Sequence, residues 1–190
     1  MGLRLYGDLP LVEPSELTEA PAPIELVIAL DTSGSCRGEL CRRFLRETLG
    51  LLQQLTDNRR RFRVLLLQCD DEIQDQRLLE TPEELEALRH GVKLRGFGGT
   101  DFSPVFQRVR ELRQSGVLGD VQCLLYFTDG YGAFPQEAPD YPACFLLSAP
   151  GKDDPVADLY GALPSWAEAW ELNEDKHHLE LRRSLMEVLT

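Results

Sequence analysis

The sequence predicts an α/β fold in which a mostly parallel sheet carries helices on both faces. Short apolar runs alternate with helix-like segments along the chain, and the runs are continuous rather than alternating in polarity. Continuous apolar runs are typical of strands buried on both faces, as in parallel sheets. The length of 190 residues suits one such domain, which we expect over residues 24–190.

The segment before this domain is expected to be an extended arm. Residues 1–23 contain four prolines, which disfavour a regular helix.

Three strands and one helix are expected in the first half of the domain. Residues 24–30 (IELVIAL) and 63–69 (RVLLLQC) are short apolar runs and predict buried strands. Leucine and phenylalanine recur at near-helical spacing over 39–55, which predicts an amphipathic helix between these strands. Residues 73–79 predict a strand at the edge of the sheet.

Two helices separated by a glycine-rich loop are expected next. Thr81-Pro82-Glu83-Glu84 has the pattern of a capping box with proline at the first helical position, so a short helix should run to His90. Gly96 to Asp101 forms the loop, and Ser103-Pro104 begins the second helix.

The remaining elements are three strands and a closing helix. Apolar runs predict core strands at 121–127 and 143–147 and a last strand at 167–172. The closing helix is expected over 174–189.

Composition and charge exclude some classes of function. The chain has 32 acidic and 20 basic side chains, a formal net charge of −12. This balance argues against a surface that binds nucleic acid, which would need Lys and Arg to neutralise phosphates. No apolar run approaches the ~20 residues that span a bilayer, and no signal peptide opens the chain, so we expect no membrane partner.

The cysteines favour a reduced, cytoplasmic protein. Their number is odd, five, which does not suit a disulfide framework. Cys69, Cys123 and Cys144 lie in or beside apolar runs, where a thiol behaves as a small core residue. Cys36 and Cys41 have no second cysteine pair or nearby histidine with which to form a zinc site.

Three polar clusters are expected at the carboxyl ends of the strands. Asp31 to Ser35 follows the first strand, Gly98 to Asp101 precedes a helix, and Thr128 to Gly130 follows the strand at 121–127. Ligands of open parallel sheets bind at this edge. Each cluster alone would more often be a turn or a helix cap. Their joint occurrence favours a site instead.

The chemistry of these clusters favours a hard cation. They offer hydroxyls and carboxylates without an imidazole, which suits Mg²⁺ first, and Mn²⁺ or Ca²⁺ as alternatives. Ser33 and Ser35 lie two residues apart on a tight turn that Gly34 is expected to permit, so both hydroxyls can point at one centre. Gly98 and Gly99 are expected to let the second loop approach closely.

These motifs resemble a known family. Asp31-Thr32-Ser33-Gly34-Ser35, then Thr100, then Asp129 is similar to the metal-ion-dependent adhesion site of the von Willebrand factor A (VWA) domain. The longer sequence motifs, Gly99 to Phe102 and Tyr126 to Gly130, resemble those of bacterial VWA-like proteins encoded beside MoxR-type AAA+ ATPases. The resemblance covers about residues 24–172.

The resemblance implies a Rossmann-like sheet of six strands and a role for each site residue. By that resemblance Ser33, Ser35 and Thr100 bind the metal directly, whereas Asp31 and Asp129 act through water. Members of the bacterial group often carry a long amino-terminal region that resembles a metallopeptidase. This chain begins almost at the VWA-like part, so a stand-alone member and a fragment are both open.

The expected function is therefore metal-dependent binding of a partner protein, without catalysis. Neutral hydroxyl ligands would leave the cation electron-poor, and a Glu or Asp of the partner would complete its coordination. The resemblance suggests a MoxR-type ATPase as the partner. Two alternatives remain: a Mg²⁺-dependent phosphoryl-transfer enzyme with Asp31 as nucleophile, and a VWA scaffold without metal.

Several other residues near the motifs are expected to have supporting or purely structural roles. Tyr131 and Phe134, in the loop after the third motif, are expected to contribute to partner binding. Asp101 is expected to cap the following helix. Asp70 and Asp71 are expected to be solvated acids of a turn.

Overall fold

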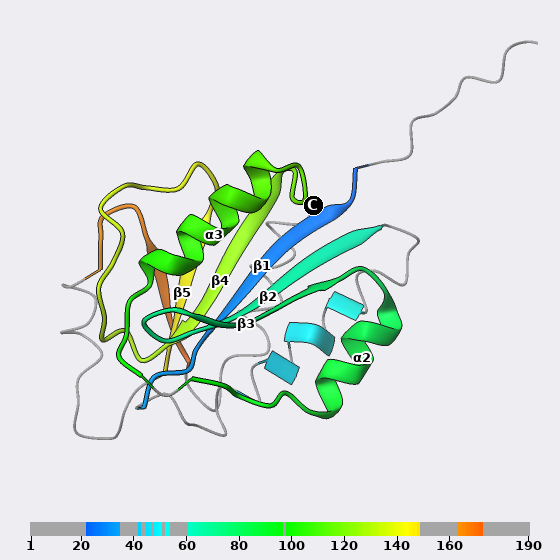
Figure 1. The fold of residues 1–190 in the computed structure, drawn as a ribbon, viewed down its shortest axis with the longest axis horizontal. Coiled ribbons are helices and arrows are strands. Elements are labelled where there is room, and N and C mark those ends of the chain that lie inside the picture. The colour runs from blue at the N-terminus through cyan, green and yellow to red at the C-terminus, as the bar shows by residue number, and fades with distance from the viewer. Residues whose placement is uncertain are drawn as a thin grey trace, which may run out of the picture.

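The computed structural model describes residues 22–34, 42, 45–46, 48–50, 52–53, 61–96, 98–148 and 163–172. Within these residues six strands form one sheet in the order β3-β2-β1-β4-β5-β6 (Figure 1). The strands are β1 (Ile24–Asp31), β2 (Phe62–Cys69), β3 (Ile73–Leu79), β4 (Val121–Thr128), β5 (Ala143–Ser148) and β6 (Glu168–Leu172).

The sheet is mixed and mostly parallel, as the sequence predicts. Only β3 runs antiparallel to its neighbour, β2, and it lies at the edge of the sheet. The strand β1 is central, with β2 on one side and β4 on the other. Because the chain continues to opposite sides of β1, the strand order reverses here, and such a reversal is where ligands bind in open α/β sheets.

Helices cover both faces of the sheet, which confirms the predicted fold class. Side chains of β1 alternate between two cores, because successive residues of a strand point to opposite faces. One core contains Ile28 together with residues of α2 (Pro82–His90), and the other contains Val27 together with residues of α3 (Ser103–Gln114). The described positions of the predicted helix at 39–55 are helical, and the buried leucines among them join the α2 side: Leu45, Leu49 and Leu52.

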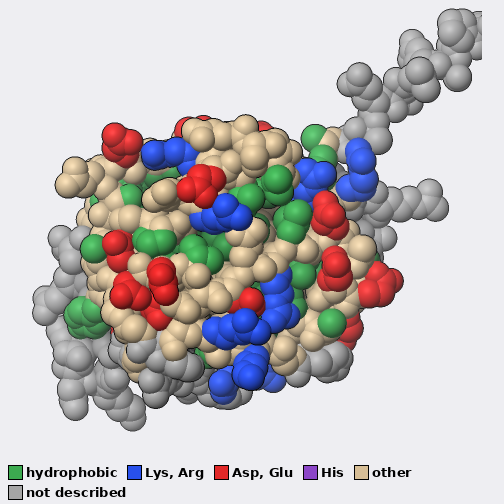
Figure 2. All heavy atoms as spheres, in the orientation of Figure 1, with side chains coloured by type: hydrophobic (Ala, Val, Ile, Leu, Met, Phe, Trp, Pro, Cys, Tyr) green, Lys and Arg blue, Asp and Glu red, His purple; other side chains and the backbone are tan. Residues whose placement is uncertain are grey.

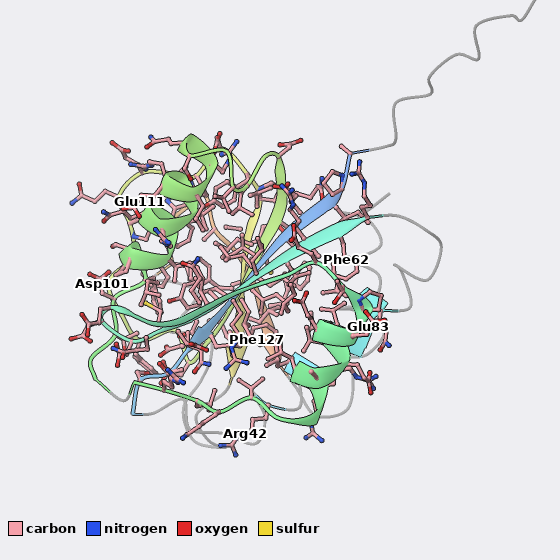
Figure 3. All side chains as sticks on the ribbon, turned by 45° about the vertical axis from the view of Figure 1, so that its right-hand side comes forward. Arg42, Phe62, Glu83, Asp101, Glu111 and Phe127 are labelled. Atoms are coloured by element: carbon pink, nitrogen blue, oxygen red, sulfur yellow. The ribbon has the colours of Figure 1, made fainter. Side chains whose placement is uncertain are left out.

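Local sequence signals account for where the two helices begin. Thr81 Oγ1 accepts a hydrogen bond from Glu84 N at 3.3 Å, and Glu84 Oε2 accepts one from Thr81 N at 3.1 Å, which confirms the capping box. At α3 the N-cap residue is Phe102, which makes no side-chain capping bond, so the expectation that Asp101 is the cap holds only in part: from one residue before the N-cap, Asp101 Oδ1 accepts a hydrogen bond from Ser103 N at 2.8 Å. Asp101 lies beside the first turn of α3 in Figure 3.

The remaining expectations about the core hold where the structure describes them. Cys69, Cys123 and Cys144 are buried and free of disulfide bonds.

No helix among the described residues is long and apolar enough to cross a membrane. Basic and acidic side chains lie interspersed over the face drawn in Figure 2. The arm up to residue 21, Ser35, Cys36, Cys41 and the predicted closing helix at 174–189 lie outside the described residues.

Candidate metal-binding site

Asp31 is the last residue of β1 and is buried among the strand ends, with 1% of its surface exposed. Its Oδ1 accepts a hydrogen bond from Ser33 N at 2.8 Å, and its Oδ2 accepts one from Thr128 Oγ1 at 2.6 Å. Burial raises the pKa of the Asp31 carboxyl; the hydrogen bonds from Ser33 and Thr128 oppose this rise, and the nearby charge of Asp129 adds to it. The site is therefore built around a carboxylate whose negative charge is poorly solvated.

The end of β4 supplies the residues that face Asp31. Register pairs Leu30 of β1 with Phe127 of β4, which brings Asp31 and Thr128 side by side. The Thr128 hydroxyl also accepts a hydrogen bond from Gly130 N at 3.0 Å, and Gly130 adopts a φ of 86°, which favours glycine. Asp129 is buried, and its Oδ1 accepts a hydrogen bond from Tyr131 N at 3.1 Å.

Thr128 contacts the candidate site through a hydrogen bond to Asp31, a role that sequence reasoning missed. It belongs to the third predicted motif, but only the pairing of β1 with β4 shows that its hydroxyl orients Asp31. The signal that could have found it is the threonine at the last position of β4, directly after the buried run Leu124 to Phe127.

Backbone hydrogen bonds hold the loop that carries Thr100 on two sides. On one side Asp101 N donates to Asp70 O at 2.9 Å, at the end of β2. On the other side Ala133 N donates to Thr100 O at 3.3 Å, and Phe102 N donates to Ala133 O at 2.9 Å. Phe102 itself is fully buried in the α3 core. Thr100 thus lies in a segment anchored between the turn after β2 and the loop after β4.

Gly132 permits the approach of these two loops. A Cβ atom at this position would lie 2.7 Å from Thr100 Cγ2 and 2.9 Å from the ring of Phe102. Distances under 3.0 Å essentially do not occur for real Cβ atoms, so a side chain here would displace Thr100 or Phe102.

Asp70 contradicts the expectation of a solvated turn acid. Its exposed fraction is 2%, and its carboxylate accepts three hydrogen bonds: from Gly98 N at 2.9 Å, Gln74 Nε2 at 2.9 Å and Glu72 N at 3.2 Å. Burial alone would raise the pKa of the Asp70 carboxyl, but these hydrogen bonds outweigh it and hold the pKa well below its usual range. The expectation was wrong because only the tertiary fold brings Gly98 to this turn. The neighbouring Asp71 is exposed, as expected.

The turn after β1 agrees with the prediction in part. Ser33 is buried beside Asp31, whereas Ser35 lies outside the described residues. The expectation about Gly34 is not supported, because its φ is outside the left-handed region and no described atom lies within 4 Å of the position of a Cβ. Gly98, in contrast, is close-packed as expected: a Cβ there would lie 2.8 Å from Asp71 Oδ1. Gly99 has only ordinary contacts.

The described residues fit a hard divalent cation. Two buried carboxylates, Asp31 and Asp129, lie close enough to repel each other, and a cation would relieve this repulsion. Thr32 Oγ1 is buried in the same turn without a hydrogen-bond partner. The turn therefore contains a buried hydroxyl whose hydrogen-bonding potential is not satisfied. In the described part of the chain no three His, Cys, Asp or Glu side chains form a metal cluster. The candidate site differs from such a cluster, because it combines only two carboxylates with several hydroxyl groups.

The two aromatic residues expected to contact a partner differ in exposure. Tyr131, near the start of the loop after β4, is 52% exposed. Phe134 is half-buried, with its ring centroid 4.7 Å from that of Phe102 and 5.2 Å from that of Phe145. Their role in partner binding stays a prediction.

Comparison with known proteins agrees with this architecture. The family model described as VWA-like domain (DUF2201) matches residues 26–172. Among the curated proteins no similar sequence was found. Among solved structures, the conserved hypothetical protein BatB from Bacteroides thetaiotaomicron superimposes with a TM-score of 0.58 at 11% identity, covering 87% of this chain and 98% of BatB.

Two further structures share the fold. The pilus adhesin SpaC from Lactobacillus rhamnosus GG, in its open conformation, gives a TM-score of 0.62 at 12% identity, covering 88% of this chain and 30% of SpaC. A von Willebrand factor type A protein from Catenulispora acidiphila gives 0.55 at 14% identity, covering 86% of this chain and 42% of that protein. At such identities the likeness concerns the fold alone. A VWA-like domain suggests a protein-interaction module.

Proposed function

Since the chain belongs to the VWA-like domain family (DUF2201), we propose that it is a divalent-metal-dependent protein-binding module. The observation that carries the proposal is the buried Asp31 carboxylate, oriented by Ser33 and Thr128 at the point where the strand order reverses. The residues that would hold Mg²⁺, or Mn²⁺ or Ca²⁺ in its place, are Asp31, Ser33, Ser35, Thr100 and Asp129.

Recognition of the partner follows from the charge of these ligands. A bound divalent cation would supply a Lewis-acid position for one carboxylate oxygen of the partner. The protein's own residues have three tasks: the hydroxyls of Ser33, Ser35 and Thr100 add no charge, Asp31 and Asp129 hold the site together, and Thr128 keeps Asp31 oriented. The ligand we propose is a Glu or Asp side chain of a second protein, which would bind cooperatively with the metal.

The partner we propose is a MoxR-type AAA+ ATPase in the cytoplasm. Support comes from the resemblance of Gly99 to Phe102 and Tyr126 to Gly130 to the bacterial VWA-like proteins encoded beside such ATPases. Tyr131 is exposed and its N–H donates to Asp129 Oδ1, which supports the proposal that its ring would contact the partner.

The alternative of phosphoryl transfer by Asp31 has less support. Both Asp31 oxygens accept hydrogen bonds and the side chain is almost fully buried. A nucleophile needs room for the incoming phosphorus, and a side chain with 1% of its surface exposed offers little, so this environment better suits a carboxylate that organises the strand ends.

Titration with Mn²⁺ tests the metal part of the proposal. Wild-type protein and Thr100→Ala are compared by isothermal calorimetry, with Ser115→Ala as the control, because Ser115 carries its hydroxyl at the opposite end of α3. We expect saturable binding of one ion by wild type and the control, and binding weakened at least about tenfold in Thr100→Ala. Equal affinities in all three proteins, or no binding by wild type, would contradict the proposal.

Capture from native cytosol tests the partner part. Immobilised wild type and Thr100→Ala are each incubated with Mg²⁺ and then with EDTA, and retained proteins are identified by mass spectrometry. We expect a MoxR-type ATPase to be retained only by wild type in Mg²⁺. Retention that survives EDTA would favour a scaffold that binds without metal.

A further inference from the structure

Asp70 is a buried carboxylate that the proposed metal site does not use. We infer that Asp70 is a positioning residue for that site: it fixes the loop that presents Thr100. This inference rests on the proposed function, because the placement of the loop matters for binding only if Thr100 is a ligand.

The attachment of Asp70 to this loop flanks Thr100 on both sides. Two residues before Thr100, Gly98 N donates to Asp70 Oδ2 at 2.9 Å. One residue after it, Asp101 N donates to the backbone oxygen of Asp70 at 2.9 Å. A single residue at the end of β2 therefore fixes the backbone immediately before and after the expected ligand.

Residues that follow Asp70 in the chain hold its carboxylate in place. Its Oδ1 accepts hydrogen bonds from Glu72 N and Gln74 Nε2, and Asp70 N donates to Glu72 O at 3.2 Å. Both carboxylate oxygens are thus occupied by neutral N–H donors. This is the environment of a carboxylate that organises the backbone, with two donors on Oδ1 and one, Gly98 N, on Oδ2.

Close packing makes the fit of the loop around Asp70 specific. A Cβ at Gly98 would lie 3.1 Å from Asp70 Oδ2, and one at Gly96 would lie 2.7 Å from the same oxygen. Gly96 also has a φ of 111°, which L side chains rarely adopt. The backbone of the loop therefore approaches the Asp70 carboxylate closely at two positions, Gly96 and Gly98.

Replacing the carboxylate by an amide changes these contacts without changing shape. In Asp70→Asn one oxygen becomes an NH₂ group, which then faces an N–H donor whichever way the amide is turned. We expect Mn²⁺ affinity to fall about 10- to 100-fold, the range seen when residues that orient metal ligands are lost. Asp71→Asn is the matched control, because it removes the same charge from the exposed neighbour and should change affinity less than about twofold.

The experiment combines Mn²⁺ titration with hydrogen exchange of the metal-free proteins. In Asp70→Asn the amides of Gly98 and Asp101 should exchange faster than in wild type and in Asp71→Asn, while circular dichroism stays unchanged. Wild-type Mn²⁺ affinity in Asp70→Asn, or wild-type exchange at both amides, would overturn the inference. If wild type itself takes up no Mn²⁺, the proposed function fails, and the exchange rates alone decide whether Asp70 holds the loop.

A milder variant covers the case in which Asp70→Asn does not fold. Gln74→Ala removes one donor to Asp70 Oδ1 and leaves the bond to Gly98 in place. Affinity for Mn²⁺ should then fall about fivefold, the effect of one hydrogen bond. An unchanged affinity in that variant would overturn the inference.

Discussion

At the scale of single residues, the site depends on contacts between side chains that are distant in sequence. Asp31 and Thr128 are 97 positions apart, yet the Thr128 hydroxyl donates to the Asp31 carboxylate at 2.6 Å. Thr100 and Gly132 lie on different loops, and the missing side chain of Gly132 makes their contact possible. Each contact is specific enough that one substitution tests it.

Thr128→Val should destabilise the protein by about 2–3 kcal/mol. The substitution keeps the shape, but it removes a hydrogen bond to a buried carboxylate and leaves Gly130 N without its acceptor. Denaturant unfolding measures the loss, and Thr128→Ser, which keeps the hydroxyl, should lose only about 1 kcal/mol. Equal losses in both variants would mean that the hydroxyl contributes nothing.

Gly132→Ala should weaken Mn²⁺ binding about tenfold and cost about 1–3 kcal/mol of stability, because its Cβ displaces Thr100 or Phe102. Gly99→Ala is the control, since a Cβ at Gly99 would meet its nearest described atom, Asp71 Cβ, at 3.8 Å. Calorimetric titration and denaturant unfolding of both variants give the comparison. Wild-type behaviour of Gly132→Ala would show that the loops tolerate a wider separation.

At the scale of elements, the two ends of the sheet have different tasks. The carboxyl ends of β1 and β4 carry the candidate ligands, whereas an ion pair between Glu25 and Arg63 joins the amino ends of β1 and β2. Glu25 of β1 is buried, and it accepts hydrogen bonds from Gly119 N at 2.5 Å and from an Arg63 nitrogen at 3.3 Å. This cluster ties β1 and β2 to the connection between α3 and β4.

Glu25→Gln should lower the free energy of unfolding by about 1–3 kcal/mol, because a buried charge pair is broken and Arg63 stays behind. The exposure of Arg63 keeps the loss below that of a fully buried pair. Glu80→Gln removes the exposed partner of the same arginine and should cost at most about 0.5 kcal/mol. Mn²⁺ affinity should stay unchanged in both, since Glu25 lies at the opposite end of β1 from Asp31; a lower affinity would contradict this separation of tasks.

At the scale of the whole molecule, a cation bound at the strand ends would join segments from three parts of the chain. The turn after β1, the Thr100 loop and the end of β4 meet there. A ligand that binds only the folded protein stabilises it by mass action. Metal binding should therefore be visible as a change in global stability.

Mg²⁺ at about 100 times its dissociation constant should stabilise wild type by about 2.7 kcal/mol. For a chain of this size the melting temperature should rise by about 5–10 °C. Thr100→Ala is the matched control, because it has the same net charge and therefore the same non-specific response to salt. Equal shifts in the two proteins, measured by calorimetry with EDTA as reference, would argue against a specific site.

The sequence by itself determined the type and order of the described elements and the clusters at the strand ends. Buried strands, the capping box at Thr81 and the motif at Asp31 are local patterns, fixed by burial and by hydrogen bonds between near neighbours. Only the tertiary structure decided that Asp70 is buried while Asp71 is exposed, that Thr128 orients Asp31, and that Gly132 must lack a side chain. These facts depend on the order in which the strands pair, which brings distant segments together; a pattern within one segment does not show which other segment it will meet.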